Sequence, residues 1–122
     1  MRESKLTLVK ASLRAKLNSL EEVVDYIVNY SGKVINLNCC IITCGIDFRK
    51  IFKSLESTHF AAFIEKEEYI ALLGNTAVRY IVNVPMYCDG VWFKKETFIN
   101  NITFKKRVTF TGASFDDFYS FD

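Results

Sequence analysis

Hydrophobic residues recur at helical spacing in three stretches of the first half of the chain. Between Ser4 and Leu17 the leucines and the valine fall on one stripe and the basic residues lie away from it, which is typical of an amphipathic helix. Ser19 and Glu22 have the spacing of a capping box, and Gly32 is a natural C-terminal stop, so we predict a second helix between them. Asp47 is predicted to cap a third, short helix in the middle of the chain.

The second half of the chain alternates apolar and polar residues and predicts strands. A first strand is expected earlier, from Val34 to Cys44, and its end is apolar on both faces. The charged run Glu65–Glu68 is expected in a hairpin tip or an exposed loop. The other predicted strands are Phe60–Ile64, Tyr69–Leu73, the segment between Gly74 and Pro85, Val91–Phe93 and Ile102–Phe110.

This order of elements predicts a single α+β domain over residues 1–122. N-terminal helices and one short middle helix would pack on a mostly antiparallel β-sheet. Tight turns at Asp89-Gly90 and Asn100-Asn101 connect successive strands, as in hairpins. We find no internal repeat, linker or low-complexity tract in the sequence.

The composition is that of a globular chain and argues against several classes of function. Half of the 122 residues are hydrophobic, and 16 basic residues against 14 acidic ones give a net charge of +2, too small to steer the protein to nucleic acid or anionic lipid. We see no long uncharged apolar run and no basic-then-apolar leader, so neither a membrane span nor a signal peptide is expected. Each of the five glycines ends a predicted element, which leaves none for a phosphate-binding loop.

The cysteines and the single histidine are the candidates for chemistry. The four cysteines are expected to be structural thiols, with a metal site, a disulfide and a reactive thiol as alternatives: Cys39, Cys40, Cys44 and Cys88. A dyad of His59 with Cys44 or Cys88 is a further alternative, because dyads assemble in space rather than in sequence. The three sequential carboxylate pairs diverge and indicate a helix cap and two solvated turns. We therefore predict no enzyme, no metal and no cofactor.

Basic and aromatic residues are interleaved in the C-terminal strands. A sheet face with such residues would neutralise phosphates and stack bases, and the cations concerned are Lys94, Lys95, Lys105 and Arg107. On the last predicted strand, however, Phe104 and Phe110 share one side and the cations share the other. A solvated sheet face is therefore favoured, and a single-stranded nucleic-acid binder is kept as an alternative.

The last ten residues, 113–122, are predicted to be a contact-making tail beyond the last strand. Four aromatic residues lie there among three aspartates: Phe115, Phe118, Tyr119 and Phe121. Exposed apolar clusters mark contacts, and aromatic side chains anchor interfaces, so these four are the predicted partner-binding residues. Packing of the tail against its own domain is the more ordinary outcome for such a cluster, and docking on a partner is weighed against it. The basic N-terminal helix and the acidic tail would also attract neighbouring copies head to tail.

One protein family has a similar order of elements. The resemblance is carried by the helix Leu20–Tyr30, the strand Ile35–Thr43, the helix Asp47–Leu55 and the passage Leu72–Phe93 with its proline-ended strand. This order resembles the central, axial domain of tailed-phage major capsid proteins and covers about two thirds of the chain. The resemblance implies no catalytic residue and no cofactor. The long spine helix, extended loop and N-terminal arm of the family are missing, which implies a smaller virion component, a capsid-derived binding protein or an assembly modulator.

The leading hypothesis is thus a non-enzymatic phage or viral protein that acts through protein–protein contacts as a virion structural or assembly component. Its expected partners are other copies of itself or virion proteins, and its expected location is the virion or the host cytoplasm. The first alternative is a small phage-encoded inhibitor that binds and blocks a host protein. The second is the single-stranded nucleic-acid binder.

Overall fold

The computed structural model describes residues 15–30 and 32–121, with side chains up to residue 118. Two α-helices lie within these residues, α2 (Leu20–Tyr30) and α3 (Phe48–Leu55), together with the 3₁₀ turns η1 (His59–Phe63) and η2 (Leu72–Gly74). The strands are β1 (Lys16–Leu17), β2 (Ile35–Asn36), β3 (Ile41–Ile42), β4 (Ile46–Asp47), β5 (Ile64–Ile70), β6 (Thr76–Val82), β7 (Met86–Tyr87), β8 (Trp92–Ile99), β9 (Ile102–Phe104), β10 (Val108–Thr109) and β11 (Ser114–Phe121).

Most strand pairs are parallel, and the last three pairs begin with the same sequence offset. The chain passes through three sheets as β6, β7 and β8 and then visits the same sheets again as β9, β10 and β11. Each strand of the second passage begins opposite a residue 22 positions before it: Ile102 pairs with Tyr80, Val108 with Met86 and Ser114 with Trp92. Within β11 the offset falls to 21 at Asp117 and Phe118, between two register shifts. The chain therefore winds into a short parallel β-solenoid, with a middle coil (residues 80–99) and a last coil (residues 102–121) stacked on it.

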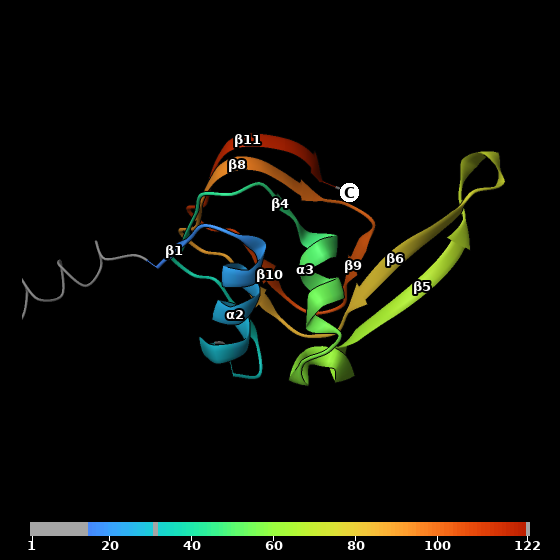
Figure 1. The fold of residues 1–122 in the computed structure, drawn as a ribbon, viewed down its shortest axis with the longest axis horizontal. Helices are drawn as coiled ribbons and strands as arrows, with labels where there is room; N and C mark the ends of the chain where they lie inside the picture. The colour runs from blue at the N-terminus through green and yellow to red at the C-terminus, as the bar shows by residue number, and fades with distance from the viewer. Residues whose placement is uncertain (1–14, 31, 122) are drawn as a thin grey trace, which may run out of the picture.

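An earlier passage of the chain lies on the other side of the middle coil. Ile35 pairs with Met86 and Ile41 pairs with Trp92, again in parallel and again with one common offset. In Figure 1, β8 and β11 run side by side with β11 outermost, and α2 and α3 lie together on one side of the coils.

The predicted mostly antiparallel sheet is wrong. Among the described strands, only β5 and β6 pair antiparallel. The tight turns at Asp89-Gly90 and Asn100-Asn101 are corners of a coil rather than hairpin turns. Gly90 and Gly112 occupy equivalent corners with φ of 68° and 69°, a left-handed conformation that a residue without Cβ adopts without strain.

The sequence shows no internal repeat, whereas the structure contains one. The repeat lies in the spacing of strands and corners and not in residue identity, since Cys88 and Phe110 occupy equivalent positions in two coils.

Several predicted elements differ from the observed ones. The N-terminal helix Ser4–Leu17 falls largely outside the described residues, and its last residues form β1, so the helices expected at the N-terminus reduce to α2 in the described chain. Val34–Cys44 contains two short strands separated by a turn at Cys39, where φ is 63°. Ile102–Phe110 also divides in two, with Lys106 at the corner between β9 and β10. The charged run Glu65–Glu68 lies within β5, and Phe60–Phe63 lie in η1 rather than in a strand.

Both helices that follow a predicted cap are confirmed. The backbone N–H of Glu22 donates to Ser19 Oγ at 3.2 Å, and the Glu22 carboxylate accepts from the Asn18 N–H at 2.8 Å, which completes the capping of α2. Asp47 Oδ1 accepts from the Arg49 N–H at 3.0 Å and begins α3. Both caps are local signals, which explains why the sequence predicts them correctly.

Phe93 connects the helix layer with both coils. Its ring stacks on Phe115 of the last coil with centroids 4.7 Å apart and planes 6° from parallel. It meets Phe48 of α3 edge-on at 6.2 Å and Phe110 at 6.4 Å, and only 1% of its surface is exposed. The coil stack is therefore held together by aromatic contact in its interior as well as by the strand ladder.

The antiparallel pair β5 and β6 forms a hairpin arm (residues 64–82) that projects from the coils (Figure 1). Ile64, Tyr80 and Val82 anchor its base in the core. Lys66 Nζ pairs with Glu56 Oε1 just after α3 at 3.5 Å, a half-exposed ion pair near the base of the hairpin arm.

Replacing Phe93 with alanine is expected to lower the free energy of unfolding by about 3–5 kcal/mol. Removal of the ring leaves a cavity where the helix layer and the two coils now pack against it. Chemical denaturation followed by far-UV circular dichroism measures this value. Lys95→Ala, on the same strand but exposed, serves as the control and should stay within about 0.5 kcal/mol of wild type. A loss below about 1 kcal/mol for Phe93→Ala would contradict the central role of this ring.

Candidate interaction surfaces

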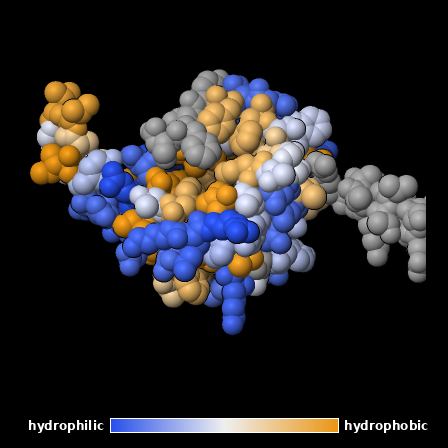
Figure 2. Space-filling model, turned by 180° about the vertical axis from the view of Figure 1, so that it is seen from behind, coloured by the Kyte–Doolittle hydropathy of each residue, from blue (hydrophilic) through white to orange (hydrophobic). Residues whose placement is uncertain are grey.

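The end of the hairpin arm is the most exposed apolar feature of the described chain. Ile70, Leu72 and Leu73 are 79%, 89% and 97% exposed, and we call these three side chains the arm tip. Figure 2 shows them as a hydrophobic knob that stands clear of the body. Single exposed leucines are ordinary on protein surfaces, but here one isoleucine and two leucines are exposed together at the end of a projecting hairpin.

The backbone of the arm tip also carries a local cost. Leu73 has φ of 64°, in the left-handed region that leucine rarely enters. The Ala71 N–H donates to the Asn75 carbonyl at 2.7 Å and the Gly74 N–H to the Ala71 carbonyl at 3.3 Å, so the turn is well formed. Turns of this kind ordinarily use Gly, Asn or Asp. The leucines therefore add nothing that the turn itself requires.

The two paired strands of the hairpin arm, β5 and β6, form its shaft. The shaft is stiffened by side-chain pairs and is acidic. Arg79 lies over the Tyr69 ring at 4.8 Å and pairs with Glu67 across the strands at 3.8 Å. Among the described residues, no ion pair involves Glu65 or Glu68, whereas the cations of the shaft, Lys66 and Arg79, are both paired. The arm tip is thus presented on a shaft with surplus negative charge.

The outer surface of the last coil is the second candidate, and we call it the coil end. Its apolar side chains are Phe104, Val108, Phe110 and Phe115, all of which are partly exposed. The equivalent residues of the middle coil are at most 1% exposed: Val82, Met86, Cys88 and Phe93. Repeat proteins usually finish with a coil that has a polar outer face, and this coil does not.

The last coil also carries exposed charges of both signs. Lys105, Lys106 and Arg107 form an exposed basic corner between β9 and β10, and no ion pair joins them to the described residues. Asp116 and Asp117 form an exposed acidic edge on β11. An apolar centre with a polar rim is the usual anatomy of a protein interface.

The structure places the predicted tail in a strand rather than beyond the last strand. Residues 114–121 form β11, paired in parallel with β8. Phe115 is half-buried at the coil end, and Phe118 meets it edge-on at 4.9 Å and stays 38% exposed. Tyr119 and Phe121 belong to β11, and their side chains lie outside the described ones. A role of this segment in contact with a partner stays a prediction.

The predicted nucleic-acid residues do not share one sheet face. Lys94 and Lys95 lie on β8, where Lys94 packs over the Trp92 ring at 4.6 Å. Lys105 and Arg107 lie at the corner between two other sheets, next to the coil end. Nucleic-acid binding stays a prediction that this arrangement does not favour.

The candidates for chemistry are separated in the structure. His59 Nε2 lies 3.0 Å from the Gly32 carbonyl oxygen, its ring packs on Phe60 at 4.3 Å, and no described hydrogen bond joins it to Cys44 or Cys88. All four thiols are free. Burial raises the pKa of Cys40 to about 11 and raises that of Cys88 further still, so both are poor nucleophiles at neutral pH. The described residues contain no cluster of potential metal ligands.

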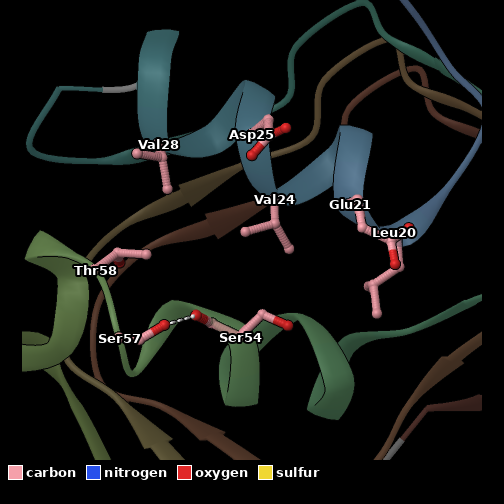
Figure 3. Close-up of a pocket in the computed structure, with 8 residues that line it drawn as sticks. All are labelled: Leu20, Glu21, Val24, Asp25, Val28, Ser54, Ser57 and Thr58. Carbon is pink, nitrogen blue, oxygen red and sulfur yellow. Dashed lines mark hydrogen bonds between the residues drawn. The ribbon is translucent and has the colours of Figure 1, made fainter.

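A shallow groove of about 430 Å³ separates α2 from α3 (Figure 3). Leu20, Val24 and Val28 of α2 form its apolar side. On the opposite side the Ser57 hydroxyl donates to the Ser54 carbonyl at 3.1 Å, and the Thr58 hydroxyl donates to a backbone carbonyl at 2.7 Å. The hydroxyls of Ser57 and Thr58 are thus already engaged by the backbone of their own segment.

Comparison with known proteins gives no relative. No protein-family profile, no curated protein and no solved structure matches this chain. The resemblance to phage capsid domains therefore stays a prediction. No helix within the described residues is long and apolar enough to cross a membrane.

Thiol labelling tests the burial of the cysteines. At about pH 8, roughly one Cys40 thiol in a thousand is ionised, given its pKa of about 11. Iodoacetamide should therefore modify exposed Cys39 first and leave Cys40 and Cys88 intact in the folded protein, as read by peptide mass spectrometry. Denatured protein, in which all four react, is the control. Rapid modification of Cys88 in the folded protein would contradict this placement.

Proposed function

We propose that this protein works without catalysis, by protein–protein contact, and that the arm tip is the part that enters the partner. The observation that supports the proposal is the exposure of three large apolar side chains at the end of a stiff hairpin. The body of the protein does not need them, because the hairpin arm is anchored at its base by Ile64, Tyr80 and Val82.

The magnitudes favour an anchor that is assisted by charge. Burying the three side chains of the arm tip would contribute about 1.5–3 kcal/mol each. Association costs about 4–15 kcal/mol in lost freedom of motion, so the tip alone gives weak binding. Glu68 near the tip, together with Glu65 at the base of the hairpin arm, would add steering toward cations. The fitting partner surface is an apolar pocket bordered by basic side chains.

A lipid surface fits the hairpin arm less well than a protein does. Segments that bind at a membrane surface usually carry Lys, Arg or Trp next to their apolar residues. Here the nearest charged residue before the arm tip is Glu68, and no cation follows until Arg79. Anionic lipid would repel this shaft.

The two hypotheses from the sequence differ only in the partner. A virion component would bind other virion proteins or itself, and an inhibitor would bind a host protein. The identity of the captured protein separates them.

Replacing Leu72 with serine and Leu73 with asparagine is expected to reduce partner capture at least 10-fold, because two buried anchors are lost. Asparagine tolerates the positive φ at position 73, so the fold should be kept. Capture from infected or host extract, quantified by mass spectrometry, is the measurement. Tyr30→Ser removes an apolar side chain that is 74% exposed on α2 and is the matched control.

Equal capture by wild type and the tip variant would overturn the proposal. Flotation with phosphatidylcholine and phosphatidylglycerol vesicles provides the second arm of the test. Tip-dependent flotation would replace the protein partner with a lipid surface.

A further inference from the structure

The coil end combines three features that point to a second protein surface. First, each of the three sheets finishes there, at β9, β10 and β11, and no described strand pairs with their outer sides. Second, the apolar residues that the middle coil buries completely are only partly buried in the last coil. Third, the basic corner and the acidic edge lie on the same coil, at different positions around it.

The distribution of charge decides what fits this surface. Lys105, Lys106 and Arg107 supply three positive charges and Asp116 and Asp117 supply two negative ones. A purely basic or purely acidic partner would meet repulsion at one of the two places. A partner with both charges in the mirrored arrangement meets attraction at both, and another copy of the coil end has this arrangement.

Addition of a strand to β11 is not the mode of contact that the structure favours. The pairing of β11 with β8 is irregular at two positions, between Phe115 and Asp117 and between Phe118 and Ser120. Bulges and charged side chains are the devices by which proteins prevent pairing at an exposed strand edge.

We propose that the coil ends of two copies of this chain pack face to face around a two-fold axis. The basic corner of each copy lies over the acidic edge of the other, and the apolar centres meet between these rims. A two-fold axis satisfies both charged contacts at once, because it applies each contact twice. The contact does not involve the arm tip, so the failure of this proposal and that of the proposed function are distinguishable.

Light scattering coupled to size exclusion tests the proposal with the full chain. Wild type should elute with twice the mass of 14.1 kDa, and raising the salt concentration should shift it toward monomer. Two variants each reverse the charge of one region. K105E/R107E reverses the basic corner, and D116K/D117K reverses the acidic edge. Each should be monomeric, with a dissociation constant raised at least ~100-fold, because like charges now face each other.

Mixing the two monomeric variants should restore a dimer, since the reversed corner of one then faces the reversed edge of the other. Two controls keep the result specific. K50E/K53E, on the exposed side of α3, changes the same number of charges away from the coil end and should stay dimeric. The tip variant L72S/L73N should stay dimeric too. Circular dichroism of every variant verifies the fold.

A wild-type protein that is monomeric throughout a dilution series would overturn the proposal. So would a dimer that survives both reversals, or two monomeric variants that do not associate when mixed. Loss of the dimer in the tip variant alone would transfer the interface to the hairpin arm and overturn the assignment to the coil end.

Discussion

The parallel stacking of the last coil on the middle coil is the constraint on which the rest of the structure depends. Backbone groups of β8 and β11 satisfy one another along the strands, and the ring of Phe93 lies between Phe48 and Phe115. A coil of this kind cannot bury its apolar residues alone and needs a neighbour on each side. The middle coil has both neighbours, and within the described chain the last coil has one, which is why its phenylalanines are partly exposed.

The sequence predicts what is local in this fold and misses what is not. The caps at Ser19 and Asp47 involve residues a few positions apart, and they are found where the pattern places them. Strand pairing is set by contacts 22 residues apart, and the turn at Asp89-Gly90 suits a hairpin and a coil corner equally well. The repeat is not visible in the sequence because equivalent positions of the two coils hold different residue types, such as Cys88 and Phe110.

The candidate surfaces were predictable to different degrees. The cluster around Phe115 and Phe118 is recognisable in the sequence because aromatic residues are dense there. The sequence does not show that this cluster belongs to a strand. The sequence alone does not single out the arm tip, because Leu72 and Leu73 fit the end of the predicted strand Tyr69–Leu73. The available signal was the pair of leucines immediately before Gly74, at positions where a turn ordinarily has polar residues. Only the exposure of the hairpin shows that they do not face a core.

The two surfaces support each other if both proposals hold. The hairpin arm leaves the molecule from β6 in the middle coil, so a two-fold contact between last coils leaves both arms available. A dimer would then present two apolar tips to a partner that has repeated binding sites. Linking two weak contacts raises the overall affinity by about 100- to 10,000-fold when the geometry allows both to engage. This gain matters here because three side chains on one arm give only weak binding, so a partner with regularly repeated sites would be bound more tightly by two arms than by one.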